Sequence, residues 1–193
     1  MAAELLTFDE ERHEYRFMGE VVPGVTSILK PLVDFSGIPR DVLAAKADLG
    51  RRVHETCQFW DEDDLDEESV QADVEPYLKA WKLFRKTTGA QVLQNERPVY
   101  EPLMNYAGTL DRVIQFDGAK WLIDLKTCFT TPLSAGPQTA AYLRALGDNT
   151  VSRRAALRLR PDGTYRLDPL TGADDWSVFM SCLTLNRFLE KNQ

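Results

Sequence analysis

Residues 107–142 read AGTLDRVIQFDGAKWLIDLKTCFTTPLSAGPQTAAY, and this stretch carries the clearest structural signals of the chain. At its centre a short apolar run, Trp-Leu-Ile, ends in the tripeptide Asp124-Leu125-Lys126. Alternate residues of a β-strand share a face, so Asp124 and Lys126 are expected to point the same way and Leu125 the other way. The pattern therefore predicts a strand that ends in a compact pair of opposite charges.

A second strand is expected just upstream. Residues 116–119, Phe-Asp-Gly-Ala, have the composition of a tight hairpin turn, and Gly-Thr-Leu-Asp111 opens the strand before it. This hairpin brings Asp111 back to the level of Asp124. Two carboxylates and Lys126 can hold a hard divalent cation and orient a water or a phosphate beside it. By itself, the Asp-x-Lys pair also fits an ordinary solvated ion pair at a sheet edge.

A helix is predicted after this hairpin. Pro137 suits its first position, Ser134 or Gly136 can precede it, and the alanines and leucines that follow favour helix. Gln138 and Tyr142 are four residues apart and share one helix face. We expect Gln138 in the first turn, where unpaired backbone N–H groups attract an anion such as phosphate.

Another helix is predicted from Pro39 to about Trp60, and it carries His54 beside an apolar stripe. A histidine in this position is commonly a partly buried residue with a local hydrogen bond. Its imidazole is also a plausible ligand for Mn²⁺ or Mg²⁺ beside carboxylates. The neighbouring Glu55 is the alternative residue that could point at the site.

The order of these motifs matters more than any one of them. A helix with Gly-x-x-x-His54, then Gly-x-x-Asp111, Asp124-x-Lys126 and Gln138-x-x-x-Tyr142 resembles the RecB-like branch of the PD-(D/E)xK nuclease superfamily. The element Pro-Gly-Val-Thr at residues 23–26 is similar to one in phage exonucleases and the mitochondrial genome maintenance exonuclease. This chain has glycine where those proteins usually have serine.

The resemblance implies a metal-dependent DNA exonuclease of phage or prophage type, active in DNA recombination, repair or processing. One or two Mg²⁺ or Mn²⁺ ions would be held by His54, Asp111, Asp124 and the carbonyl of Leu125. Lys126 would orient the attacking water or stabilise the transition state, and Gln138 and Tyr142 would position the DNA strand. The candidates for phosphate contacts are four arginines: Arg112, Arg144, Arg153 and Arg154.

The predicted fold is α/β, with a restriction-endonuclease-like central mixed β-sheet flanked by helices. A helix is expected over about 73–88, where Val74, Tyr77, Leu78, Trp81 and Phe84 face inward and Gly89 ends it. A final helix is expected over about 174–190. The chain of 193 residues is long enough for one core, so 1–193 is predicted to be a single domain. Within it, 1–90 holds a hairpin and helices and 91–193 holds the catalytic core.

The net charge of −7 argues at first against a nucleic-acid partner, but it is unevenly distributed. Seven of the eight residues from Asp61 to Glu68 are acidic, and they account for the whole net charge. We expect this run to be a solvated loop, which could also exclude DNA from one side. Residues 107–170, which carry the motifs, have nine Lys/Arg and six Asp/Glu and are mildly basic.

Three scattered cysteines, Cys57, Cys128 and Cys182, favour reduced thiols in a cytoplasmic protein and indicate no iron–sulfur cluster. No apolar run is long enough to span a membrane, and the N-terminus lacks the features of an export signal. The expected partner is DNA, as linear duplex or single strand, with a single-strand annealing or recombination protein as a further candidate. An inactive or endonucleolytic DNA-binding module of a recombination or CRISPR-type system is the alternative, and the oligomeric state is open.

Overall fold

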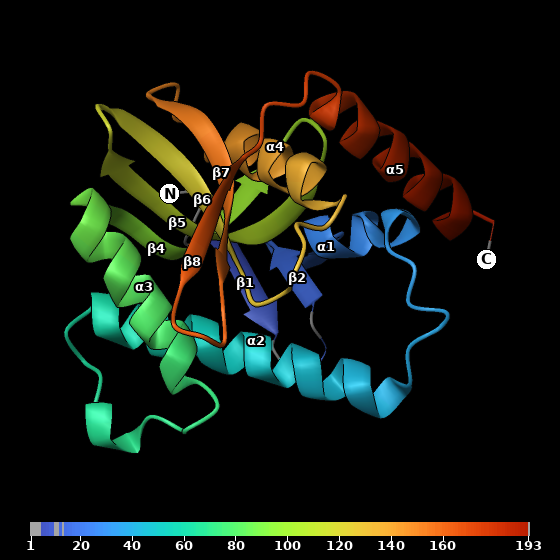
Figure 1. The fold of residues 1–193 in the computed structure, drawn as a ribbon. Helices are drawn as coiled ribbons and strands as arrows, with labels where there is room; N and C mark the ends of the chain where they lie inside the picture. Colours follow the sequence, from blue (N-terminus) through green and yellow to red (C-terminus); the bar gives the residue numbers. More distant parts are fainter. Residues whose placement is uncertain (1–4, 10–11, 13, 193) are drawn as a thin grey trace.

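A computed structural model of the chain describes residues 5–9, 12 and 14–192 and has two β-sheets (Figure 1). The small antiparallel sheet is β1-β2-β3, and the large sheet has the order β4-β5-β6-β7-β8. Strands β6 and β7 are parallel, whereas every other pair in the large sheet is antiparallel. The α/β class and the mixed central sheet are therefore confirmed. The strands are β1 Leu6–Asp9, β2 Glu14–Phe17, β3 Glu20–Val22, β4 Gln91–Glu101, β5 Tyr106–Phe116, β6 Ala119–Lys126, β7 Val151–Leu159 and β8 Tyr165–Pro169.

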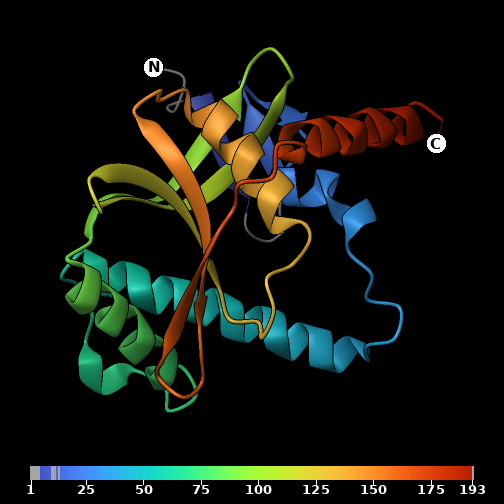
Figure 2. The same cartoon turned by 45° about the horizontal axis from the view of Figure 1, so that its top comes forward.

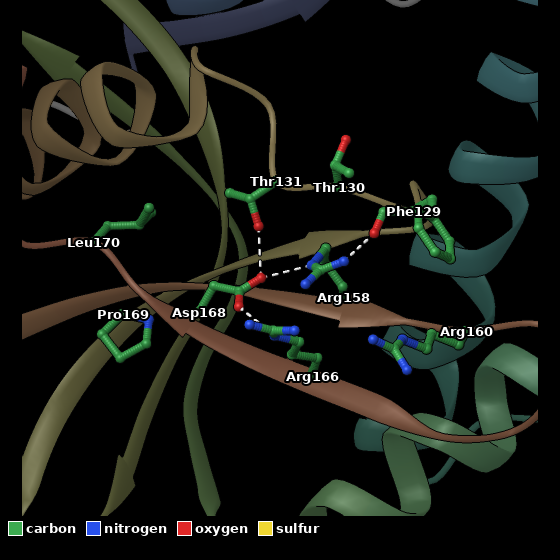
Figure 3. Close-up of a pocket in the computed structure, with 9 residues that line it drawn as sticks. All are labelled: Phe129, Thr130, Thr131, Arg158, Arg160, Arg166, Asp168, Pro169 and Leu170. Carbon is green, nitrogen blue, oxygen red and sulfur yellow. Dashed lines mark hydrogen bonds and ion pairs between the residues drawn. The ribbon is translucent and has the colours of Figure 1, made fainter.

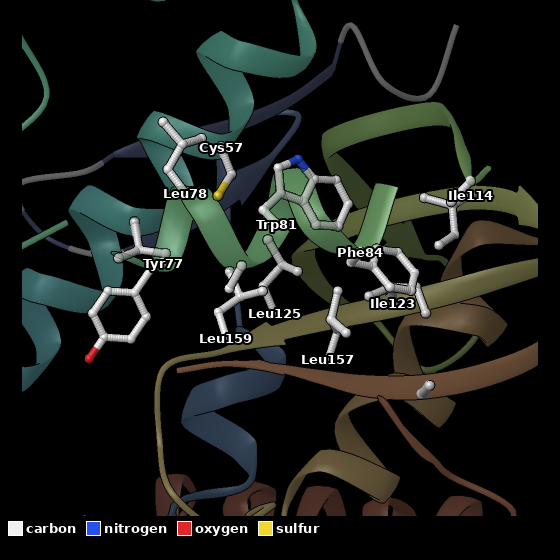
Figure 4. Packing of buried hydrophobic residues seen from close by; sticks show 14 of the residues in the cluster. Cys57, Tyr77, Leu78, Trp81, Phe84, Ile114, Ile123, Leu125, Leu157 and Leu159 are labelled. Carbon is white, nitrogen blue, oxygen red and sulfur yellow. The ribbon is translucent and has the colours of Figure 1, made fainter. Parts of the chain in front are cut away.

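Helices cover both faces of the large sheet (Figures 1 and 2). Helices α2 and α3 pack on one face, where Cys57, Trp81 and Phe84 meet Ile123 and Leu157 of the central strands (Figure 4). The other face is covered by α1, α4 and α5. This layering buries each amphipathic helix against the sheet. The helices are α1 Val25–Ile28, α2 Arg40–Asp61, α3 Glu75–Thr88, α4 Ala135–Leu146 and α5 Asp175–Glu190, with short 3₁₀ turns η2 Lys30–Leu32 and η3 Glu67–Ser69.

The predicted hairpin is present between β5 and β6. Phe116 pairs with Ala119, and the two turn residues, Asp117 and Gly118, both have positive φ, 49° and 68°. Such a two-residue turn matches the twist of the flanking strands. The predicted helix over 73–88 is also present, and Gly89 ends it in the left-handed conformation. Local signals therefore placed these elements correctly.

Two expectations about element ends were wrong. Helix α4 begins at Ala135, two residues before the predicted start at Pro137, and the Gln138 amide already donates to the Ser134 carbonyl at 2.8 Å. Gln138 therefore offers no free backbone N–H to an anion. The acidic run is also not wholly a solvated loop, because Asp61 is the last residue of α2 and its side chain is 1% exposed.

Candidate metal centre and catalytic site

Three carboxylates form a row across neighbouring strands of the large sheet. The registers on either side place Glu96 of β4 opposite Asp111 of β5, and Asp111 beside Asp124 of β6. Asp111 and Asp124 are buried, and the side chain of Glu96 is 20% exposed. The row confirms that the hairpin brings Asp111 to the level of Asp124. It also adds a third acid that the sequence motifs did not assign to the site.

Helix α2 delivers His54 to this row. Its Nδ1 lies 3.3 Å from Glu96 Oε1 and 3.8 Å from Asp111 Oδ1, so that one nitrogen faces two carboxylates. Its Nε2 lies 3.2 Å from the carbonyl oxygen of Leu125. A proton on Nε2 can be donated to that carbonyl, which orients the ring. In this arrangement the Leu125 carbonyl is the partner of His54, whereas the resemblance implied a direct metal ligand.

The main chain of β6 fixes the Asp111 carboxylate. Asp111 Oδ2 accepts a hydrogen bond from the Leu125 amide at 2.6 Å. Leu125 therefore holds both Asp111, through its N–H, and His54, through its C=O. The side chain of Leu125 points into the core on the opposite face, as the alternation of the strand predicted.

A second group of polar residues continues from Asp124. The Lys126 ammonium lies 2.8 Å from Asp124 Oδ2, and it donates to Asp124 Oδ1 at 3.0 Å and to Gln138 Oε1 at 3.3 Å. The Gln138 amide donates in turn to the Tyr142 hydroxyl at 3.3 Å. The shared helix face predicted for Gln138 and Tyr142 is therefore present. Gln138 contacts Lys126 directly, whereas Tyr142 is linked to Lys126 through Gln138.

Electrostatics set the protonation of the centre. Burial alone would lower the pKa of His54, but the Asp111 and Glu96 carboxylates outweigh it and raise that pKa to about 9. Burial raises the pKa of Asp111 to about 7, and the charge of Asp124 adds to this effect. For Glu96, contacts with His54 and Arg112 outweigh the effect of burial and lower its pKa. Without a metal, His54 is therefore an imidazolium that pairs with Glu96.

The lysine is a cation in this environment. Burial alone would lower the pKa of Lys126, but the negative charges of Asp124 and Asp111 outweigh it and raise that pKa. Lys126 therefore carries its proton at neutral pH and can act as a charged hydrogen-bond donor, not as a base. Burial raises the pKa of Tyr142 well above its usual value, so its phenol is neutral.

Arg112 is a buried cation within the protein, which corrects the prediction that it contacts phosphate. Its side chain is 0% exposed, and its guanidinium donates to Glu96 at 2.7 Å and to Asp61 at 3.0 Å. Asp61 also accepts from Arg85 and from the Trp81 indole. A guanidinium enclosed in this way cannot reach a DNA backbone. It holds Glu96 in place beside His54.

The other three predicted phosphate contacts lie apart from the carboxylate row. Arg154 is largely buried and pairs with Asp175 at 2.9 Å, so it ties β7 to the start of α5. Arg153 pairs with Asp117 of the hairpin turn at 3.0 Å. Arg144 is exposed on α4 and stacks over Trp176, with 5.5 Å between its guanidinium carbon and the ring centroid. Arg154 is thereby engaged in structural contacts, whereas Arg144 and Arg153 remain on the surface.

The sequence motifs missed Glu96. The signal for it is weak, because an acid near Pro98 in a strand has no chemical meaning until that strand is paired. Its backbone is unusual, with φ of 39°, in the left-handed region that a residue other than glycine seldom adopts. Such strain at a polar residue commonly marks a site where geometry is imposed by function.

The residues present are able to hold a metal ion. His54, Glu96 and Asp111 each offer a ligand atom, and these atoms all lie within 4.8 Å of one another. His54 Nδ1 lies 3.3 Å from Glu96 Oε1 and 3.8 Å from Asp111 Oδ1. These distances are close to the roughly 3 Å between adjacent oxygen or nitrogen ligands of a small hard cation. Asp124 lies next to this group, and its Oδ2 is ion-paired with the Lys126 ammonium at 2.8 Å.

No known protein-family model matches this chain. No curated protein matches it either. Within the described part of the chain, no helix is long and apolar enough to cross a membrane.

Proposed function

We propose that this protein is a metal-dependent deoxyribonuclease that hydrolyses phosphodiester bonds and acts as an exonuclease on linear DNA. The observation that carries the proposal is the meeting of His54, Glu96 and Asp111 beside the Asp124–Lys126 pair. Three carboxylates and one imidazole can supply ligands for a divalent cation, and one ammonium can supply a charged donor, which together suit metal-assisted hydrolysis of a phosphodiester. The order of the sequence motifs supports the same proposal.

Each residue then has a defined part. His54, Glu96 and Asp111, with Asp124 beside them, would hold Mg²⁺ or Mn²⁺, and the ion would supply a Lewis acid for the attacking water and positive charge beside the scissile phosphate. Lys126 donates to the oxygen on which negative charge develops in the transition state. Gln138 holds the Lys126 ammonium from the helix side, and Tyr142 holds the Gln138 amide.

The proposal is tested by digestion of end-labelled linear duplex, single-stranded DNA and covalently closed circular duplex. Cleavage of the linear substrates should require Mg²⁺ or Mn²⁺ and stop in EDTA, while the closed circle should resist. Conversion of the closed circle to linear DNA by cleavage at discrete sites would identify an endonuclease. Intact DNA in every arm, with both metals present, would show that the centre does not cleave DNA.

Asp124→Asn keeps the side-chain shape but removes the charge that holds Lys126. We expect it to lower the cleavage rate by roughly a hundredfold or more, the cost of misplacing a group that stabilises the transition state. Asp117→Asn is the matched control, because Asp117 lies in the turn of the same hairpin, is exposed, and tolerates asparagine at its positive φ. Full activity of Asp124→Asn in Mg²⁺ would remove Asp124 from the mechanism.

A further inference from the structure

A row of basic residues crosses strands β6, β7 and β8 next to the carboxylates. Lys126 of β6 pairs in register with Arg158 of β7, and Arg158 pairs with Arg166 of β8. Neighbouring strands lie about 4.8 Å apart, so the two arginines stand roughly 5 and 10 Å from the lysine. Like charges directly across a sheet repel each other and need a compensating partner. Here that partner is Asp168.

Asp168 accepts hydrogen bonds from both arginines. Its Oδ2 accepts from Arg158 Nε at 2.6 Å and from Thr131 Oγ1 at 2.6 Å, and its Oδ1 accepts from Arg166 Nε at 2.9 Å. Figure 3 shows Arg158 and Arg166 both directed at this carboxylate. One aspartate cannot neutralise two arginines. The pair therefore remains positively charged; the Arg158 side chain is 8% exposed, whereas that of Arg166 is 62% exposed and can reach a ligand.

An open cavity of about 450 Å³ lies beside this cluster. It is lined by a third arginine, Arg160, whose side chain has no ion pair within 4.0 Å among the described residues and whose Nε is buried without a hydrogen-bond partner. Three arginines against one aspartate give the lining a net charge of +2. This electrostatic excess favours a ligand with more than one negative charge.

Phe129 lines the same cavity from the loop that follows Lys126 (Figure 3). Its side chain is 86% exposed, an unusual position for a large aromatic ring. Its carbonyl accepts a hydrogen bond from Arg158, so the loop is tied to the basic row. Exposed aromatic rings beside arginines are how proteins bind single strands, because every base can stack on the ring while the arginines contact phosphates.

We propose that this cavity, formed by Phe129, Arg158, Arg160 and Arg166, binds a single-stranded segment of the DNA next to the bond that is cut. A base stacks on Phe129, and the adjoining phosphates contact Arg160 and Arg166. The row from Lys126 to Arg166 leads the strand from the metal centre to the cavity. This inference rests on the proposed function for the identity of its ligand as DNA.

The test measures binding of a fluorescein-labelled oligothymidylate of about 12 nucleotides in EDTA, which prevents cleavage. Arg160→Gln/Arg166→Gln should weaken binding and lower the slope of log affinity against log salt by about 1.4, the loss of two phosphate contacts on a single strand. The matched control is Lys30→Gln/Lys191→Gln, which removes the same charge from exposed positions elsewhere. An equal loss of affinity in both double variants would show that only net charge matters, and it would contradict the proposed binding site.

The stacking role has its own control. Phe129→Ala should weaken binding of the oligothymidylate about tenfold or more, and Phe129→Tyr should restore it, because tyrosine keeps a π-face. Leu133→Ala should change nothing, since Leu133 is an equally exposed apolar residue of the same loop, 88% exposed, that does not line the cavity. Unchanged binding in Phe129→Ala would remove the ring from the site.

The two proposals fail separately. If wild-type protein degrades linear DNA while the double arginine variant binds oligothymidylate as tightly as wild type, the cavity is not the strand site and the nuclease proposal stands. If no DNA is cleaved but binding depends on Arg160 and Arg166, the cavity stands and the nuclease proposal falls.

Discussion

At the scale of single residues, Arg112 connects the fold to the candidate site. It is fully buried, and its positive charge lies between Asp61 at the end of α2 and Glu96 in the carboxylate row. Removing a charge from water is costly, and the cost is recovered only when the partners are close and well oriented. Arg112 therefore fixes the strained Glu96 by the same contacts that hold α2 against the sheet.

Arg112→Met should lower the free energy of unfolding by roughly 3–5 kcal/mol, because it leaves buried carboxylates without their cation. Urea denaturation with an unchanged m-value is the measurement. Arg153→Met is the matched control, since it breaks an ion pair with Asp117 whose partners are 47% and 72% exposed. Its effect should stay within the range of ordinary surface substitutions. Similar losses in both variants would contradict the structural role of Arg112.

The protonation of His54 is expected to make metal binding at the centre depend on pH. The pKa of this histidine is raised to about 9 and that of Asp111 to about 7, so at pH 6 both carry a proton that a bound cation must displace. The affinity for Mn²⁺ should therefore rise from pH 6 towards pH 9, by up to about tenfold per pH unit for each proton displaced. Isothermal titration calorimetry in buffers of different ionisation enthalpy measures both the affinity for Mn²⁺ and the number of protons released on binding.

His54→Ala separates the two interpretations of this histidine. If it is a metal ligand, the variant should bind Mn²⁺ more weakly and with a shallower pH dependence, while its melting temperature changes little. If it serves only packing, the melting temperature should fall and the Mn²⁺ affinity should keep its wild-type pH dependence. The second result would show that His54 is not a metal ligand and that any metal site consists of carboxylates alone.

At the scale of elements, the contact of β5 with α4 depends on a glycine. A Cβ atom added at Gly108 would lie 2.5 Å from Cε1 of the Tyr142 ring and 3.3 Å from Val25. The ring cannot move away easily, because Tyr142 is buried and its hydroxyl accepts a hydrogen bond from the Gln138 amide. The glycine of the Gly-x-x-Asp motif thereby allows α4 to approach the strand that carries Asp111.

Gly108→Ala should destabilise the protein by about 1–3 kcal/mol, the usual cost of overpacking a well-filled core. It should also reduce any cleavage activity, since it displaces Tyr142 from the residues around Lys126. The control is Gly37→Ala, where an added Cβ would meet nothing within 4 Å. Urea denaturation of both variants measures the difference. A stability of Gly108→Ala equal to that of Gly37→Ala would show that α4 adapts without strain.

The start of α4 shows the limit of a local signal. Proline is tolerated throughout the first turn of a helix, because no residue there has an N–H that needs a partner within the helix. Pro137 therefore allowed a start at any of several positions. The structure begins the helix at Ala135, and this shift removes the free amide that the sequence had assigned to Gln138.

At the scale of the whole molecule, one core joins the two halves of the chain. The face of the sheet that carries Ile123 and Leu157 is covered by Cys57 of α2 and by Trp81 and Phe84 of α3 (Figure 4). His54 reaches the centre from the first half, whereas Glu96, Asp111 and Asp124 belong to the second. The division into 1–90 and 91–193 is thus a division of the sequence and not of the core.

A fragment of residues 91–193 should therefore fail to fold by itself. It keeps all five strands of the large sheet but leaves one apolar face uncovered, which favours aggregation. The expected result is a lack of near-ultraviolet circular dichroism and of a cooperative thermal transition, with the full chain as the control. A soluble fragment with a cooperative transition would contradict the shared core.

Elements that depend on short-range rules could be predicted from the sequence. The alternation around Asp124 and Lys126, the Asp-Gly turn and the glycine after α3 act over a few residues, so the hairpin and most helices could be predicted. The same rules placed Asp111 level with Asp124, because a two-residue turn leaves only one register. The order of the motifs assigned His54, Gln138 and Tyr142 to the candidate site, and their catalytic roles stay predictions.

The contacts between distant side chains, in contrast, depend on how the elements pack. Glu96 joins the centre because β4 pairs with β5 in one register, and no local rule selects the partner of a strand. Arg112 and Asp61 look like surface charges in sequence, yet the packing of α2 on the sheet encloses both. The basic row from Lys126 to Arg166 requires β7 and β8 to add beside β6. Such contacts join residues tens of positions apart, and their energy depends on burial, which exists only after the chain has folded.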